Sequence, residues 1–473
     1  MRYHVTGKRQ VIPLEFGAES KMTRRDREAV TSAVMLALAA ALQACNGTSE
    51  DASSAPPAEA GDVFEIRCGA LLDGVGDRLL DDRVIGIRDA RIVSVTPIGV
   101  AVADADDGRA PDLDLGGYTC LPGLIDTHVH LASRASDSSD MAAIYRRSIA
   151  ETTRIAEANA ATTIAAGFTT VRNVGDYFPA AVLDLRQRIE AGAIAGPRIL
   201  TAGPYLTIPA GGGDLVIPGL DEAEIPAAAR QGVARGPEEF ADKAQAAIDA
   251  GADHLKVIAS GAVFAFGGVP GAPEMTEAEI AAVVAVARAN GVKVTAHAHG
   301  AESIKQAIRA GVDSIEHASL ADDEAIAMAA GRGVAFSMDV YNGTYTAEVG
   351  EQLGYPEEFM RKNDETTEAQ RIVFEKAHAA GVPILYGTDA AVYPHGLNAR
   401  QFEVMVARGM SPADAIRSAT SLAAEELGVA GDVGALVPGR YGDIVAVRGN
   451  PLEDISVLQD IAVVVKSGEV VRP

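Results

Sequence analysis

The chain has 473 residues, 48% of them hydrophobic, which is enough to bury the core of one large domain and a small one. Its 41 basic and 65 acidic residues give a net charge of −24, which repels the phosphates of nucleic acids and anionic membrane surfaces. The sequence has no Trp and only 5% aromatic residues, so a base-stacking surface is not expected either. We therefore expect an enzyme that acts on small molecules, with no nucleic acid as partner.

The first 45 residues have the pattern of an export signal. From Met22, the better candidate for the start, a basic stretch leads into an apolar run over residues 31–45 that is too short to span a bilayer comfortably. The run ends in the sequence LQAC at Cys45, which resembles the bacterial lipobox and implies a lipid anchor on Cys45 and a periplasmic, membrane-attached protein. A secretory signal cleaved nearby, with Cys45 incidental, is the alternative. Residues 46–61 are small, polar and Pro-containing, which predicts a flexible tether.

Strand-like segments at the two ends of the chain share one pattern. Residues 62–120 and 430–473 contain stretches that alternate apolar with polar residues and are rich in Val and Ile. We predict that both ends form one small β-sandwich domain. Cys68 and Cys120 lie in this domain, where an exported protein can keep a disulfide. We favour the alternative of two separate buried thiols, because sequence alone does not establish the distance between them.

Residues 121–429 repeat one unit: an Ala-rich amphipathic helix, a glycine, and a short apolar strand that ends in polar residues. Examples are DAGADHLKVIASG, ANGVKVTAHAHG and AAGVPILYGTDA. The glycine is typical of a helix that ends in the left-handed conformation. Such repeats predict alternating α and β with parallel strands, and eight strands can be counted, the number that closes a (β/α)8 TIM barrel. A doubly wound open sheet is the alternative.

Polar residues recur at the carboxyl ends of these strands, where barrel enzymes place their active sites. His128 and His130 lie two residues apart and therefore point to the same side of their strand. Neutral imidazoles and a carboxylate suit Zn²⁺ or a similar divalent ion. A lysine ammonium would repel such an ion, whereas its CO2 adduct, a carbamate, is anionic and able to bridge two ions. The candidates after the later strands are Lys256, His297, His317 and Asp389, and the lysine predicts a site for two metals.

The motifs LPGLIDTHVHL, HLKVIASG, TAHAHG, IEHAS and YGTDA, in this order, resemble the amidohydrolase superfamily in its two-metal, carbamylated-lysine form. Over residues 62–473 the chain is most similar to the branch of prolidase-like and carboxypeptidase-like dipeptidases that includes ochratoxin-hydrolysing amidases. The resemblance implies one metal on His128 and His130 and a carbamate on Lys256 that bridges to the other. Asp389 would bind the first metal and carry a proton from the bridging water to the leaving amine. The second metal would lie on His297 and His317.

Three further residues are candidate contacts for the substrate. The family register assigns His297 to the metal, which leaves His299 to contact a substrate carboxylate or carbonyl oxygen. Tyr341, after the seventh strand, and His395, in the loop after the eighth, also lie where they can reach a substrate, with packing inside the protein as the alternative for both.

Polar residues near these motifs are also interpreted as structural. Arg172 is near the predicted barrel mouth, where we expect an ion pair with Asp176 or with a neighbouring strand end. His254 precedes Lys256 by two residues and is expected to pack lower in the barrel.

We predict a metal-dependent dipeptidase or carboxypeptidase that cleaves the amide bond before a C-terminal amino acid. Its substrate would be a small peptide, such as an Xaa-Pro or other dipeptide, or an N-acyl amino acid such as an ochratoxin-like amide. The alternatives are an imidazolonepropionase-like cyclic amide hydrolase or a deaminase, which typically use one metal and lack the bridging lysine. A non-catalytic binding lipoprotein is a third, but it should have lost ligands. A homo-oligomer is expected.

Overall fold

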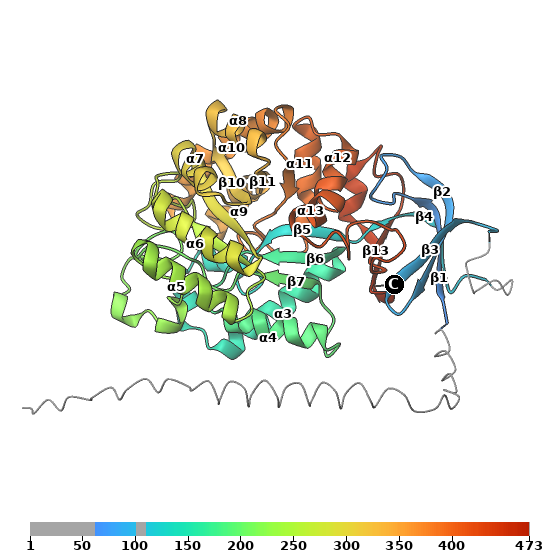
Figure 1. Cartoon of the computed structure of the whole chain (residues 1–473), viewed down its shortest axis with the longest axis horizontal. Helices are drawn as coiled ribbons and strands as arrows, with labels where there is room; N and C mark the ends of the chain where they lie inside the picture. The colour runs from blue at the N-terminus through green and yellow to red at the C-terminus, as the bar shows by residue number, and fades with distance from the viewer. Residues whose placement is uncertain (1–61, 101–109, 473) are drawn as a thin grey trace, which may run out of the picture. The chain divides into compact units, whose positions relative to one another are not determined.

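A computed structural model describes residues 62–100 and 110–472 of the chain. The predicted export signal, Cys45 and the predicted tether lie outside the described residues. Within the described ranges, no helix is long and apolar enough to cross a membrane. The strands form a mixed sheet built from both ends of the chain and two parallel sheets from the residues between them (Figure 1).

The mixed sheet has seven strands in the order β15-β14-β13-β4-β1-β2-β3. Strand β4 joins the two ends of the chain, because it pairs parallel with β1 on one side and antiparallel with β13 on the other. We expected two packed sheets, whereas these strands are hydrogen-bonded into one sheet, so the sandwich stays a prediction. The strands are β1 (Phe64–Leu71), β2 (Leu80–Arg88), β3 (Arg91–Pro97), β4 (Leu113–Pro122), β13 (Ile444–Val447), β14 (Ile461–Lys466) and β15 (Glu469–Arg472).

Cys68 on β1 and Cys120 on β4 form a disulfide, with Cα atoms 5.9 Å apart, so our preference for two separate thiols was wrong. The reason lies in the register of the two strands. The pairing shifts from Cys68 opposite Leu115 to Ala70 opposite Thr119, so β4 uses four residues where β1 uses two. This β-bulge draws Cys120 towards Cys68, and it contains Gly116 and Gly117, residues of a type that often marks a bulge.

Eight parallel strands lie between the chain ends, in sheets of order β12-β11-β10-β9-β8 and β5-β6-β7. Among the described residues, the two sheets are connected by isolated parallel bridges, each with one residue beyond the end of a strand: Leu206 with Val257 at one seam, and Val129 with Ala390 at the other. The α/β class with parallel strands is confirmed, and closure of all eight into one barrel stays a prediction. The strands are β5 (Leu124–Val129), β6 (Phe168–Asn173), β7 (Arg198–Thr201), β8 (His254–Ile258), β9 (Lys293–Gly300), β10 (Ser314–Leu320), β11 (Ala335–Met338) and β12 (Ile384–Tyr386).

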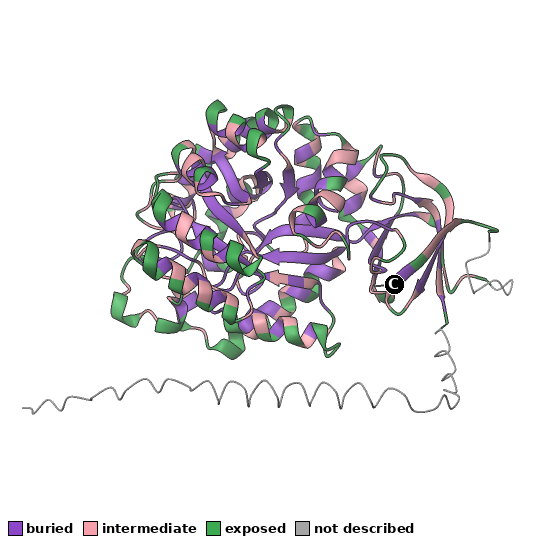
Figure 2. Ribbon diagram, viewed as in Figure 1, coloured by how far each residue is buried: buried purple, intermediate pink, exposed green. Residues whose placement is uncertain are grey.

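Helices surround these strands, and Figure 2 shows the strands buried and the outer helix faces exposed. Three helices end as the sequence predicted, at Gly291, Gly311 and Gly333, each with a left-handed backbone. The helices are α2 (Ala142–Arg146), α3 (Ile149–Ala165), α4 (Pro179–Glu190), α5 (Gly236–Asp249), α6 (Glu277–Asn290), α7 (Ala301–Ala310), α8 (Asp323–Arg332), α9 (Asn342–Leu353), α10 (Glu357–Ala379), α11 (Gln401–Ala407), α12 (Pro412–Ser418) and α13 (Ser421–Glu426).

Candidate metal centre

One cavity of about 170 Å³ collects the side chains that the sequence predicted as metal ligands. They come from five different strands or from the residues that directly follow them, although they are spread over more than half of the sequence. All of them are wholly or largely buried, which is unusual for so many polar and charged side chains in one place. The cavity is lined by His128, His130, Lys256, His297, His317 and Asp389, together with His299.

The first group of side chains surrounds the carboxylate of Asp389. The Nε2 atoms of His128 and His130 each lie 3.3 Å from Asp389 Oδ1. His128, His317 and Asp389 each offer a ligand atom, and these three atoms lie within 4.8 Å of one another. A divalent ion takes two imidazoles and a carboxylate at about this spacing.

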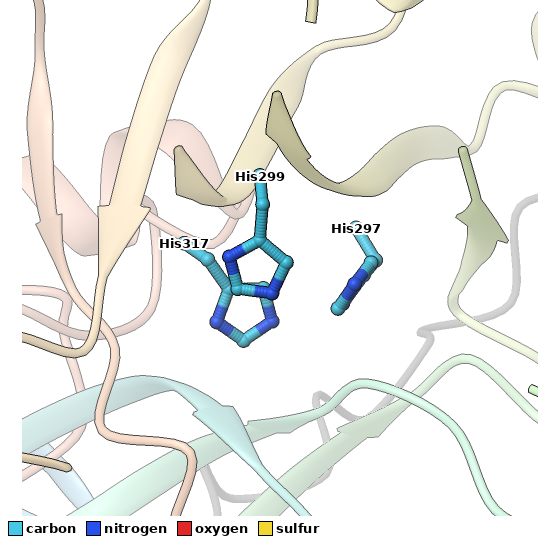
Figure 3. A group of neighbouring side chains, drawn as sticks. All are labelled: His297, His299 and His317. Carbon is cyan, nitrogen blue, oxygen red and sulfur yellow. The ribbon is translucent and has the colours of Figure 1, made fainter. Parts of the chain in front are cut away.

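The second group consists of three imidazoles from neighbouring strands β9 and β10. His297, His299 and His317 each offer a nitrogen, all within 4.8 Å of one another. The rings of His299 and His317 are stacked with centroids 4.6 Å apart, and His297 stands beside them across a small gap (Figure 3). Because His317 belongs to both groups, the two candidate ligand sets adjoin each other, as a site for two ions requires.

Hydrogen bonds on the outer side of the rings determine which nitrogen faces the cavity. The Nδ1 atom of each of three rings donates to an oxygen of the protein. His128 donates to Glu316 Oε2 (2.8 Å), and His317 donates to Asp339 Oδ1 (3.0 Å). His130 donates to the carbonyl oxygen of Gly175 (3.0 Å). A proton on Nδ1 leaves the lone pair of Nε2 free for a metal, and such outer partners are typical of metal-binding histidines.

The side chain of His297 provides an independent test of whether the residues of the cavity fit a metal ion. Its Nε2 atom is buried and has no hydrogen-bond partner among the described residues. An unpaired buried polar atom is costly, so a group that accepts the lone pair of this nitrogen would stabilise the site. Imidazole and carboxylate donors suit Zn²⁺ and related ions, so the residues present fit a divalent metal.

Lys256 lies in the same cavity and is only 2% exposed. Its ammonium makes no ion pair within 4 Å among the described residues, and burial lowers the pKa of this lysine to about 8. A lowered pKa increases the fraction of neutral amine near neutral pH, and the neutral amine is the form that reacts with CO2.

Comparison with known proteins identifies the family of the chain and the class of bond on which it acts. Residues 119–471 match the sequence profile of the amidohydrolase family. The chain belongs to this family. It is therefore a hydrolase that acts on amide C–N bonds.

Relatives of this amidohydrolase include curated and solved proteins. It is 30% identical to the ochratoxinase of Aspergillus niger over 361 residues, 72% of each chain. It is 34% identical to a Xaa-Pro dipeptidase solved with methionine bound in the active site, with a TM-score of 0.79 and coverage of 86% of this chain and 99% of that one. The solved structure of A. niger ochratoxinase is 26% identical, with a TM-score of 0.75 and coverage of 87% and 95%.

A buried ion pair behind the metal centre was not predicted. Arg172 donates from Nη2 to Glu316 Oε1 (2.6 Å). Asp176 instead accepts a hydrogen bond from Asn173 (2.6 Å), so the expected ion pair of Arg172 with Asp176 was wrong. Burial alone would raise the pKa of Glu316. The positive charges of Arg172 and His128 lower it by more than burial raises it, so the pKa lies well below its usual range. The one available signal was a charged residue directly before His317, in the segment SIEHASL.

Two predicted substrate contacts do not line the cavity. The Tyr341 hydroxyl accepts from Arg400 Nη1 (3.2 Å), and its ring packs on Tyr393. The ring nitrogens of His395 lie 2.9 Å from Thr163 Oγ1 and 3.4 Å from the His130 carbonyl oxygen. Both residues therefore pack inside the protein, the alternative that the sequence left open, although their neighbours in the chain, Asn342 and Val392, line the cavity. His254 is also buried, and neither ring nitrogen has a partner among the described residues.

Two of the candidate ligands have unusual backbone conformations. His317 has φ of 70° and Asp389 has φ of 58°, in the left-handed region that residues other than glycine avoid. Such conformations cost about 1–3 kcal/mol each and tend to persist at functional sites. They direct these two side chains towards the cavity at the ends of their strands.

Proposed function

We propose that this amidohydrolase uses two divalent metal ions to cleave the amide bond before the C-terminal residue of a dipeptide or an N-acyl amino acid. The observation that carries the proposal is the pair of adjoining ligand groups in one cavity, which Lys256 also lines. The named activities of two relatives, an ochratoxinase and a Xaa-Pro dipeptidase, support an amide of this kind. A related prolidase solved with N-methylphosphonate-L-proline, 28% identical with a TM-score of 0.79, adds further support.

The proposed ligands divide between two ions, most simply Zn²⁺. His128, His130 and Asp389 would hold one ion and His297 with His317 the other, and Lys256, as its carbamate, would lie between them. When bound, such ions lower the pKa of water towards neutrality and polarise a carbonyl oxygen. His299, which lines the cavity without being needed as a ligand, is placed to contact the substrate carbonyl or carboxylate.

Asp389 would handle the proton. Its Oδ1 atom faces His128 and His130, and its Oδ2 atom accepts from Asn342 Nδ2 (3.1 Å), which fixes the carboxylate plane. Burial raises the pKa of Asp389, but the two imidazoles lower it by a larger amount. The carboxylate is therefore ionised near neutral pH. An ionised carboxylate so held can accept the proton of the attacking water and return it to the nitrogen of the leaving amine.

A substrate screen tests this proposal directly. The full chain, supplied with Zn²⁺ and bicarbonate, should hydrolyse dipeptides or N-acyl amino acids that vary at the C-terminal residue, and Asp389→Asn should not. Metal analysis should find about two ions per chain. One ion per chain with hydrolysis of cyclic amides would favour an imidazolonepropionase-like or deaminase activity, and no ion would favour a non-catalytic binding protein.

The proposal for the cellular location rests on sequence alone. The LQAC sequence at Cys45, after a basic stretch and an apolar run, supports an exported lipoprotein attached to a membrane. Metabolic labelling with a fatty acid should mark the wild-type protein and leave Cys45→Ser unmarked.

A further inference from the structure

A loop directly after β8 forms part of the cavity wall. Its base is closed by two backbone hydrogen bonds, from Gly261 to the Ala272 carbonyl oxygen (3.0 Å) and from Gly271 to the Gly261 carbonyl oxygen (3.1 Å). We call residues 261–271 the β8 loop. Its first residues, Ala262, Val263 and Phe264, line the same cavity as the metal-binding groups.

The base of the β8 loop lies against the strand that carries two of the histidines. Gly271 has φ of 85°, and a Cβ atom there would come within 2.7 Å of Gly300, which ends β9 directly after His299. Only glycine allows this approach. The loop therefore starts from a fixed point beside the metal centre.

The tip of the β8 loop is held by helix α10. Lys362 is fully buried and donates from Nζ to the Ala265 carbonyl oxygen (2.5 Å), and it forms an ion pair with Glu358 Oε1 (2.8 Å). The same Glu358 oxygen accepts from the backbone N–H of Gly267 (3.0 Å). Two consecutive turns of α10 thus bind two points of the loop, and we call Lys362 and Glu358 the clamp.

Aromatic packing also holds the β8 loop against α10, through Phe359, which lies between Glu358 and Lys362 in the helix. The rings of Phe264 and Phe266 lie 5.5 and 4.7 Å from the ring of Phe359. Phe264 lines the cavity, so its ring is in contact with α10 on one side and faces the substrate space on the other.

A buried ammonium at this place is not explained by packing. Removing a lysine from water is expensive unless it is fully paired, and an apolar side chain of similar length would fill the space more cheaply. The ammonium of Lys362 contributes what such a residue lacks, a bond to a backbone carbonyl of the loop. Its contribution is therefore to the position of the β8 loop.

The same face of α10 reaches the metal centre. Lys362, Thr366 and Gln370 are spaced by four residues and so lie in one row along the helix. Thr366 and Gln370 line the cavity, and Gln370 Nε2 donates to Asp339 Oδ1 (2.6 Å), the carboxylate that accepts from His317. One row of side chains thus sets the distance between the loop wall and the second ligand group.

We propose that the β8 loop selects an apolar side chain of the substrate and that Lys362 is the positioning residue that fixes this wall. The inference rests on the function proposed above and assigns it a specificity element. The side chains that the loop presents are apolar, and so are several that line the rest of the cavity: Met141, Ile144 and Val392. The group recognised is therefore an aliphatic or aromatic side chain next to the scissile amide.

Lys362→Met tests the role of the clamp, because methionine keeps the length and apolar stem of the side chain. Lys376→Met is the matched control, since Lys376 lies on the same helix but is half exposed and pairs with Asp323 at the surface. With N-acetyl-L-phenylalanine, kcat/KM should fall about tenfold or more in Lys362→Met, mainly through KM, as expected for a displaced positioning group. With N-acetylglycine it should change little, and both variants should keep the wild-type metal content.

Hydrogen exchange provides a readout that does not depend on activity. The amide of Gly267 should exchange faster in Lys362→Met than in the wild type or Lys376→Met. Glu358→Gln, which removes the charge and keeps an acceptor oxygen, should give a smaller increase. Equal exchange in all four proteins would overturn the clamp, and an unchanged ratio of the two substrates would overturn the selectivity.

The failure of the proposed function looks different from the failure of this inference. A wild-type protein that carries two metals and hydrolyses no N-acyl amino acid or dipeptide contradicts the proposed function. The affinity for L-phenylalanine, measured by calorimetry, then decides the role of the loop: weaker binding in Lys362→Met alone supports it, and equal binding in wild type and variant refutes it.

Discussion

Glu316 links the stability of the protein to the position of His128 in the candidate metal centre. The residue is fully buried, and its carboxylate accepts from Arg172 Nη2 (2.6 Å), from His128 Nδ1 (2.8 Å) and from the hydroxyl of Thr295. Glu316→Gln keeps the size of the side chain and removes its charge. The guanidinium of Arg172, 6% exposed, then has no counter-charge, and breaking a buried pair in this way costs about 3–5 kcal/mol.

Urea unfolding at pH 7 measures this loss. The control is Glu157→Gln, which breaks a partly exposed pair with Arg188 and should cost at most about 1 kcal/mol. Because the amide introduced in Glu316→Gln satisfies His128 and Arg172 less well than a carboxylate, the affinity for Zn²⁺ should also fall about 10–100-fold in a chelator competition. A loss below about 1 kcal/mol together with unchanged Zn²⁺ affinity would refute the argument.

Three other changes have expected outcomes. Lys256→Met should lose most of the bound metal, measured by elemental analysis, and bicarbonate should not restore hydrolysis; full metal content in this variant would contradict the bridging role. Replacing Cys68 and Cys120 by Ser opens a loop of 52 residues. The free energy of unfolding, measured by urea denaturation, should fall by about 4 kcal/mol. No change would show that the disulfide is absent from the folded protein. Burial raises the pKa of Asp176 from 3.8 to about 7, so the folded state holds this proton where the unfolded state has lost it. The contribution of Asp176 to the unfolding free energy should therefore fall as the pH rises from about 4 to 7, by up to about 1.4 kcal/mol per pH unit. A titration series on the wild type and Asp176→Asn measures this contribution as the difference between the two proteins, and a difference that does not change with pH would contradict it.

The side chains that the sequence predicted as metal ligands line one cavity, and they could be picked out because their signals are local. A histidine pair two residues apart, or one polar residue at the end of an apolar strand, marks a position without knowledge of distant contacts. The glycine after each helix predicted the alternation of helix and parallel strand in the same way. These features are set within about ten residues, and the chain topology then brings the strand ends together.

Contacts between distant segments could not be predicted in this way. Arg172 and Glu316 are 144 residues apart, and their pairing depends on which strands face each other inside the fold. The disulfide depends on a bulge in β4, and the packing of Tyr341 and His395 depends on contacts with the distant residues Arg400 and Thr163. His297 and His299 also remain close competitors, because both lie in the same histidine group.

The arrangement of the mixed sheet has a consequence for how the chain is made. During synthesis from the amino terminus, β4 emerges early, but its partner β13 (Ile444–Val447) is among the last segments to leave the ribosome. Until then one edge of β4 is open, and open edges of apolar strands pair readily with other chains. We therefore expect the nascent protein to need protection by chaperones through most of its translation. A chain that stops before Ile444 should aggregate even though every predicted metal ligand is already present.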